Sequence, residues 1–599
     1  MGIPAHSRWG PPLEQYVLRY DKTSIRGRPE MVNPEIMTPA RTCLKAITTI
    51  SEEADEIKFE SLAKRVTLEM LRSLWLLSLS GQGALYFAQP RLIRGCLRLM
   101  KIIKVDGLVS PFSYEYGYLC FNIGKMALGV CLVEKFHSRH LANLMNDTVV
   151  NCLTKDTPSI LTEYLSMLFL DEPKEFSQGM ARCDWIFGWS DPPAHGGHSE
   201  LIIAGSDVLD LMNVLWNDRK VLLKALSSAY TPGASIMLLP SWQYLYRMGI
   251  SLQPVSRTPL LDAFLDLTWR FTLIATPGDY GLILPIIMSA MFQSGRLPNS
   301  AVDVEDSRNI IEAYVRGLPP AEDALLYRQM SFGAYPFLPR FVAQTLLPGT
   351  EDLYIEIIKS MLGRLWEMLS WGQLGGMISP VAAVVLCFDD VMLFLRFHGQ
   401  SLQYSRSPVL QAIIEELANN DILGLIGFAI NRLYTCKDTE ANETTGYIGL
   451  TASMEFRNSV LSMFIVLNQA FSSSVIPPYF SDYWVEWVKH LQYNDTLLQM
   501  SGDSESARSS AQFRRELLWD VIRKVRPGPE IENFLNAFNR LSCNYPRCPD
   551  PSRAAYTRLW CASCVSSPGR TNYCSSRCQI LDWTSEGKRS HRELCPRSD

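Results

Sequence analysis

The chain has 599 residues, of which 47% are hydrophobic and 20% are charged, and its formal net charge is −4. This length is too great for one ordinary domain and allows a large buried core, and the composition excludes a wholly disordered chain. The small net charge provides no global attraction to nucleic acid or to an anionic membrane surface.

The N-terminal region carries no recognisable targeting signal. Met1 is not followed by the basic and apolar segments of a secretory signal, and His6 stands where a myristoylation pattern requires Ser or Thr. The nearest candidate for a membrane span, residues 381–397, falls short of about 18 residues and is interrupted by Asp389 and Asp390. We therefore expect an intracellular protein of the cytoplasm or nucleus that makes no membrane contact.

Three regions follow one another along the chain. Residues 1–30 are rich in Pro, Gly and Arg and are expected to form an extended arm. Residues 31–541 are expected to form a helical body, because apolar side chains recur at steps of three and four. Residues 542–599 hold a cluster of cysteines and are expected to form a separate small domain.

Within the body, the clearest helical patterns cover 59–77 and 354–369, and Thr350 is expected to be the N-cap of the second. The polar residues Ser501–Ser510 are expected to form a loop before another helix. Further helices are expected near 89–104, 111–135, 157–170, 200–226, 256–275, 302–317, 379–398, 407–433, 451–471 and 481–499.

Strand signals are weak in this region. Strict apolar–polar alternation is scarce, and we find no Asn-Gly or Asp-Gly hairpin between alternating runs. The sequence therefore predicts an all-α body, either an α-solenoid of the HEAT or armadillo type or an irregular helical bundle. No signature at a fixed period decides between the two. The cysteines of the body lie in apolar helical contexts and are expected to be core residues, among them Cys96, Cys120, Cys131 and Cys387.

The last part of the chain contains seven cysteines and one histidine in four close pairs: Cys543 and Cys548, Cys561 and Cys564, Cys574 and Cys578, and His591 and Cys595. Eight such donors are the number needed to fill two tetrahedral Zn²⁺ sites. In a long chain without a secretory signal, paired cysteines indicate metal ligands in preference to disulfides. A segment this short buries too little apolar surface to fold alone, so two structural zinc ions would supply its folding energy.

Zinc ligation also alters the charge of this segment. Residues 543–599 carry nine Lys and Arg against five Asp and Glu, a formal +4. Seven thiolates and two Zn²⁺ ions bring this sum to about +1, which removes the argument for direct nucleic-acid binding.

The segment resembles the MYND-type zinc finger. The resemblance is carried by Trp560-Cys-Ala-Ser-Cys564, Tyr573-Cys-Ser-Ser-Arg-Cys-Gln579, Asp582-Trp583 and His591-Arg-Glu-Leu-Cys595. Its late position and its Cys-x₄-Cys opening are most similar to fungal MYND-domain proteins. Two features depart from the family pattern: this long opening spacing and the twelve residues between Cys578 and His591. The second departure places the insert Thr584–Ser590 directly after Trp583.

The resemblance implies interleaved ligation. One site would use Cys543, Cys548, Cys574 and Cys578, and the other would use Cys561, Cys564, His591 and Cys595; the spacing alone also allows a sequential arrangement. The family binds short proline-containing peptides, and the residues that line its groove match Gln579 and Trp583. Trp583 could equally be a structural residue of the small zinc core.

Three functions are compatible with these features. The first is an adaptor whose finger captures proline-containing peptides, with a role in transcriptional regulation through protein partners and no catalytic activity. The second is an enzyme of the MYND-associated lysine methyltransferase type, but no SET-type motif is present and only Pro596–Asp599 follow the finger. The third is a nucleic-acid-binding regulator, which the acidic body and the near-neutral finger disfavour.

Overall fold

The structure is a computed structural model. It describes residues 3–20, 34–136, 157–170, 180–189, 201–248, 259–276, 302–316, 338–370, 408–431 and 505–525, together with shorter stretches within 278–287, 454–498 and 559–595. The chain divides into two compact units, Met1–Thr350 and Glu351–Asp599. The predicted helical body contributes to both units, and the cysteine-rich segment belongs to the second.

The described residues are predominantly helical, which confirms the expected all-α class. The first unit contains α1 Leu13–Tyr16, α3 Pro34–Glu52, α4 Glu56–Arg65, α5 Leu68–Ser78, α6 Gly81–Ala84, α7 Pro90–Lys101, α8 Glu115–Phe136, α10 Thr157–Leu170, α12 Gly205–Asn217, α13 Arg219–Ser228, α14 Leu238–Arg247, α15 Pro259–Ile274, α17 Val304–Arg316 and α19 Leu338–Thr345. The second contains α20 Tyr354–Ser370, α22 Pro408–Asn419, α23 Ile422–Ile430, α27 Glu505–Val525 and α29 Ser576–Thr584.

Two antiparallel strand pairs occur among the described residues. β1 Lys104–Val105 pairs with β2 Leu108–Val109, and β3 Leu559–Trp560 pairs with β4 Asn572–Tyr573. The first pair is a hairpin across Asp106 and Gly107, whose φ angles are +52° and +82°. This hairpin was not predicted from the sequence. Each strand is only two residues long, so the flanking sequence contains no alternation to reveal it.

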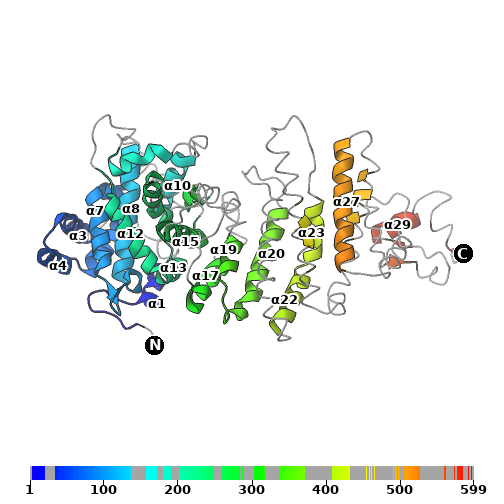
Figure 1. Ribbon diagram of the computed structural model, residues 1–599, viewed down its shortest axis with the longest axis horizontal. Coiled ribbons are helices and arrows are strands. Elements are labelled where there is room, and N and C mark those ends of the chain that lie inside the picture. Colours follow the sequence, from blue (N-terminus) through cyan, green and yellow to red (C-terminus); the bar gives the residue numbers. More distant parts are fainter. Residues whose placement is uncertain are drawn as a thin grey trace. The chain divides into compact units, whose positions relative to one another are not determined.

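The core of the first unit is built around α8. Helix α7 lies between α3 and α8 (Figure 1), and every residue of α8 from Glu115 to Val133 is buried. By length and composition α8 could cross a membrane, but the whole qualifying window is buried inside the protein, as in the core helix of a globular fold. A Cβ at Gly117 would lie 2.1 Å from the Pro111 carbonyl oxygen, so glycine permits close approach there. Cys96, Cys120 and Cys131 are buried as expected, and Cys387 lies outside the described residues.

Several predicted helices are divided by capping residues. The pattern over 59–77 is split between α4 and α5, where the Thr67 hydroxyl accepts a hydrogen bond from the Met70 amide. The pattern over 200–226 breaks at Asp218, and that over 407–433 breaks before Asp421, whose carboxylate accepts from the Gly424 amide at 2.8 Å. Thr67 and Asp421 cap the helices that follow them through their side chains, whereas the Asp218 side chain makes no capping hydrogen bond and accepts from Ser110 and Phe112 instead.

Two smaller expectations were wrong near the second unit. Helix α27 begins at Glu505, so residues 505–510 of the predicted loop Ser501–Ser510 are helical. Thr350 does not directly precede α20, because a 3₁₀ turn over Glu351–Leu353 intervenes, and its hydroxyl donates to the Leu347 carbonyl. The predicted helix at 379–398 lies outside the described residues, and 451–471 and 481–499 are described only at isolated helical positions.

The N-terminal segment is folded over residues 3–20, although an extended arm was expected for residues 1–30. Trp9, Leu13 and Tyr16 are buried, and the Tyr16 hydroxyl donates to the Phe112 carbonyl at 2.7 Å. The Tyr230 amide donates to the Tyr20 carbonyl at 2.8 Å. These contacts join the first residues of the chain to the start of α8 and to the end of α13.

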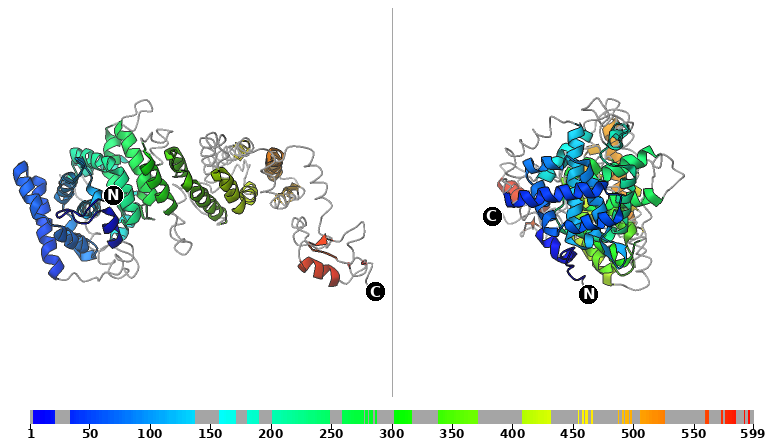
Figure 2. Two further views of the ribbon diagram at one scale, coloured as in Figure 1. Left: turned by 90° about the horizontal axis from the view of Figure 1, so that it is seen from below. Right: turned by 90° about the vertical axis from the view of Figure 1, so that its left-hand side faces the viewer.

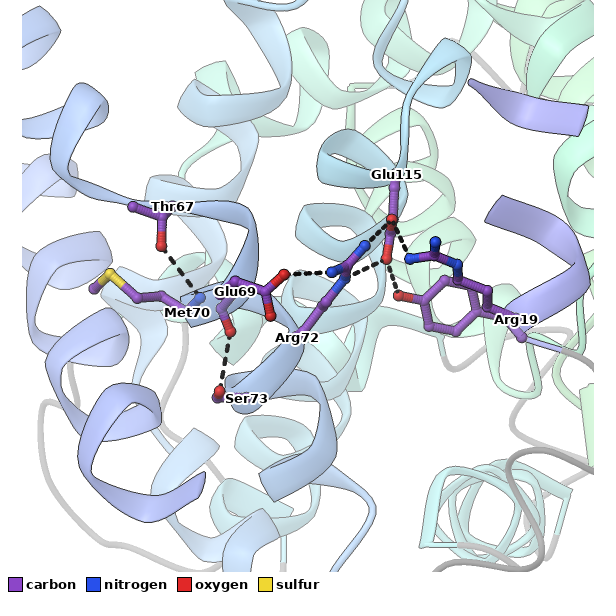
Figure 3. A network of polar contacts seen from close by, with 8 residues as sticks. Arg19, Thr67, Glu69, Met70, Arg72, Ser73 and Glu115 are labelled. Atoms are coloured by element: carbon purple, nitrogen blue, oxygen red, sulfur yellow. Dashed lines mark hydrogen bonds and ion pairs between the residues drawn. The ribbon is translucent and has the colours of Figure 1, made fainter. Parts of the chain in front are cut away.

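A single buried carboxylate anchors this segment. The Tyr20 hydroxyl donates to Glu115 at 2.6 Å, and Arg72 and Arg19 approach the same carboxylate from opposite sides (Figure 3). Glu115 is fully buried, so its charge is compensated by these donors and not by water.

In the second unit, α20, α22 and α23 pack against one another, and α23 also packs against α27. The apolar residues Ile422, Leu425 and Ile426 of α23 are fully buried in this layer.

Candidate metal centre

Four of the eight predicted ligands lie among the described residues. Cys561 follows β3 directly, Cys578 lies on α29, and His591 and Cys595 come after it. All four are buried. The other predicted ligands lie outside the described residues: Cys543, Cys548, Cys564 and Cys574.

Three of these residues form a compact donor group. The ligand atoms of Cys561, His591 and Cys595 all lie within 4.8 Å of one another. The two sulfur atoms are 3.7 Å apart. A tetrahedral Zn²⁺ with Zn–S bonds of about 2.3 Å would hold two sulfurs about 3.8 Å apart, whereas a disulfide requires about 2.05 Å. The observed separation therefore fits two thiolates that share a metal ion.

Local structure accounts for how the three donors meet. The Cys595 amide donates to the His591 carbonyl at 2.8 Å, so one helical turn brings these two residues to the same side. The β3–β4 pairing aligns Trp560 with Asn572, which fixes the position at which Cys561 leaves its strand. Helix α29 lies beside this strand pair in both views (Figures 1 and 2). Donors more than thirty residues apart in sequence thereby converge.

A buried hydrogen bond between β4 and α29 stabilises this arrangement. The Tyr573 hydroxyl on β4 donates to the Asp582 carboxylate on α29 at 2.8 Å, and both side chains are buried. The Tyr573 ring also packs edge-on against His591, with 6.0 Å between ring centroids and an interplanar angle of 72°. Tyr573 therefore connects the strand pair, the helix and a donor of the cluster. Both Tyr573 and Asp582 belong to the motif seen in the sequence, but neither was assigned a role.

Trp583 and Gln579 lie one turn apart on α29. The Trp583 ring is 5.8 Å from that of His591, yet 40% of this residue remains exposed. Gln579 is partly buried, and Ile580 on the same helix is 59% exposed. One part of Trp583 therefore packs beside the donor group, and another part faces outward.

The donor set defines the chemistry available. Two thiols and one imidazole are soft donors that suit Zn²⁺, and together they provide three of the four corners of a tetrahedral site. Cys578 is buried as well but is not a member of the three-residue cluster. The structure thus brings together a Cys561, His591 and Cys595 group that could hold a metal ion.

Comparison with protein-family models gives no match, and comparisons with curated proteins and with solved structures likewise give none.

Proposed function

We propose that residues 542–599 form a MYND-type finger with two structural zinc ions, and that the protein is an adaptor whose finger binds proline-containing peptides. The observation that carries this proposal is the 3.7 Å separation of Cys561 and Cys595 beside His591. This geometry suits metal coordination and is too long for a disulfide.

The membership of the cluster supports interleaved ligation. In a sequential arrangement Cys561 would share a site with Cys543 and Cys548, away from His591 and Cys595. Its proximity to His591 and Cys595 instead matches a site completed by Cys564. The separation of Cys578 from this group is consistent with a second site that Cys578 shares with Cys543, Cys548 and Cys574.

Both metal ions would be structural. With four protein donors each, neither ion would have an open position for water or substrate, so we assign a binding role to the finger and no catalytic step. A metal held by free thiolates requires a reducing compartment, which fits the cytoplasm or nucleus.

The outward face of α29 is the proposed peptide site. Trp583 offers a flat apolar ring, and the Gln579 amide can pair with the backbone of an extended, proline-containing strand. The all-α body would act as the scaffold, in the form of an α-solenoid or an irregular bundle. Transcriptional regulation through protein partners is the process in which we place this adaptor.

Zinc analysis of the purified full-length chain tests the metal assignment. We expect two zinc ions per chain, and we expect Cys561→Ser to lose one of them. Cys131→Ala, which removes a buried thiol of the first unit, should retain both. One zinc ion or none in the unaltered protein would contradict the eight-ligand assignment.

Peptide capture tests the binding role separately. A library of proline-containing peptides should include ligands that bind the full-length protein and are lost with Gln579→Ala. Leu108→Ala, which truncates an exposed residue of the β1–β2 hairpin, is the matched control and should bind normally. Failure of the whole library to bind, with two zinc ions present, would refute peptide capture and leave the metal assignment intact.

A further inference from the structure

Two aromatic side chains join helix α29 to the donor group of the candidate metal centre. The Tyr573 ring lies edge-on against the His591 ring, and the Tyr573 hydroxyl donates to the Asp582 carboxylate on α29 at 2.8 Å. The Trp583 ring, which belongs to α29 itself, lies 5.8 Å from the His591 ring. Helix α29 is therefore held against one donor of the group both directly and through Tyr573.

The same helix carries a predicted ligand of the other zinc site. Cys578 and Asp582 are separated by one turn of α29, so they lie on the same face of the helix, and both are buried. Tyr573 directly precedes Cys574, a further predicted ligand of that site. The Tyr573–Asp582 hydrogen bond thus connects residues beside the ligands of one proposed site with a ligand of the other, His591.

This hydrogen bond is placed where a movement of α29 would break it. Tyr573 is fixed on β4 by its pairing with Leu559 on β3, shortly before Cys561. Tyr573 is fully buried and Asp582 is 3% exposed, so the bond is shielded from water. A hydrogen bond to a carboxylate is stronger than one between neutral groups, and its loss inside a protein is costly. The positions of β4 and α29 therefore depend on each other.

From these contacts we infer that the Tyr573–Asp582 hydrogen bond couples the two proposed zinc sites, so that a chain gains or loses its two zinc ions together. The inference rests on the two-zinc finger proposed above. Donors must be ordered before they can share an ion, and this ordering opposes the first binding event. Because α29 holds a ligand of one site and is joined to a ligand of the other, its ordering serves both. The segment is already ordered when the second ion binds, which gives positive cooperativity.

The size of the coupling sets what an experiment should see. Coupling between two sites is reciprocal and commonly changes affinity by about 5- to 150-fold. For two sites of equal affinity at half saturation, coupling in this range lowers the fraction of one-zinc chains from about one half to about one third or less.

Native mass spectrometry of the full-length protein during stepwise chelation tests the inference, because it counts the zinc ions on each chain. The unaltered protein should pass from two ions to none with about one third of one-zinc chains or fewer. Tyr573→Phe keeps the ring beside His591 and removes only the hydroxyl, so one-zinc chains should rise to about one half or more. Equal fractions of one-zinc chains in the two proteins would overturn the inference.

A matched variant shows whether the effect belongs to this hydrogen bond. Tyr16→Phe removes the hydroxyl of another buried tyrosine, which donates to the Phe112 carbonyl in the first unit. It should release its zinc ions as the unaltered protein does. A rise in one-zinc chains equal to that of Tyr573→Phe would contradict the assignment to the Tyr573–Asp582 bond.

A second measurement does not depend on how Tyr573→Phe folds. In Cys561→Ser, which removes a donor of one site, the zinc ion that remains should bind about 5- to 150-fold more weakly than in the unaltered protein, as measured by competition with a chelator. Unchanged affinity would overturn the coupling.

The inference and the proposed function fail in different ways. Two zinc ions that are released independently of each other would overturn the coupling and leave the two-zinc finger intact. A chain that binds one zinc ion or none would refute both.

Discussion

Arg72 binds the buried carboxylate of Glu115 with two hydrogen bonds, from Nε at 2.7 Å and from NH2 at 2.6 Å. The hydrogen bond to Glu115 is the largest influence on the Arg72 guanidinium and raises its pKa. This bidentate pair is the main charge compensation for a carboxylate that water cannot reach.

Removing Arg72 should therefore strongly destabilise the first unit. Arg72→Ala leaves Glu115 without its bidentate partner, and we expect a loss of about 3–5 kcal/mol in the free energy of unfolding. Chemical denaturation monitored by tryptophan fluorescence measures this loss. Arg91→Ala is the control, because Arg91 and Glu52 form a more exposed ion pair and should contribute less than about 1 kcal/mol. Equal losses in the two variants would contradict the anchoring role of Glu115.

Asp218 should make the first unit less stable as the solution becomes alkaline. Burial raises the pKa of this carboxyl from 3.8 to about 7, although hydrogen bonds from Ser110 Oγ at 2.6 Å and the Phe112 amide at 2.9 Å oppose the rise. Because the folded state holds this proton more tightly than the unfolded state, the stabilising contribution is complete below about pH 4. It is lost as the pH rises through 7.

An isosteric amide should remove this dependence. Asp218→Asn can keep both hydrogen bonds, since its oxygen accepts from Phe112 and its NH₂ donates to Ser110. We expect it to exceed the unaltered protein at pH 8 by on the order of 2 kcal/mol and to approach it at pH 4. Thermal unfolding at the two pH values measures the difference. Asp106→Asn, which changes an exposed carboxyl at the hairpin turn, is the control, and a parallel response of both variants would rule out the assignment to Asp218.

An aromatic and a small replacement of Trp583 should affect zinc content and peptide capture differently. Because its ring packs beside His591, Trp583→Phe should preserve zinc content while weakening peptide capture by at least about tenfold, as expected for a binding hot spot. Trp583→Ala should weaken both zinc retention and peptide capture. Comparing the zinc content of the two variants after competition with a chelator distinguishes the packing role of Trp583 from its binding role. Undiminished capture by Trp583→Phe would restrict Trp583 to packing.

Metal removal should unfold the C-terminal segment and spare the first unit. A segment this short buries too little apolar surface to fold without metal, so a strong chelator should make residues 559–595 sensitive to protease. The core around α8 has no such dependence, and its circular dichroism and fluorescence should hardly change. Collapse of the helical signal upon chelation would show that the finger and the helical body fold as one unit.

The sequence predicted the parts of this protein that depend on local patterns. Helices such as α7, α10, α15 and α17 agree with their predicted ranges within a few residues, because each has a continuous apolar face. Asp421 divides a longer pattern because one capping side chain decides where a helix begins, which periodicity does not detect. The packed N-terminal segment escaped prediction for another reason. Tyr16 and Tyr20 find their partners 96 and 95 residues away.

The sequence likewise predicts one part of the candidate site and not another. The donor types and spacings of Cys561, His591 and Cys595 are readable because metal ligation restricts residue identity. The buried pair of Tyr573 and Asp582 was not readable as a pair, since a strand and a helix must first pack for the two side chains to meet.

The contact between Tyr20 and Tyr230 has a consequence for biosynthesis. Residues 9–20 are synthesised before their binding partners at the start of α8 and, 210 residues downstream, at the end of α13. Closure of the first unit must wait until that stretch has been synthesised, so Trp9, Tyr16 and Tyr20 of the nascent chain stay exposed for many seconds at ordinary translation rates. During that interval these aromatic residues, which are buried in the folded unit, are exposed targets for chaperones.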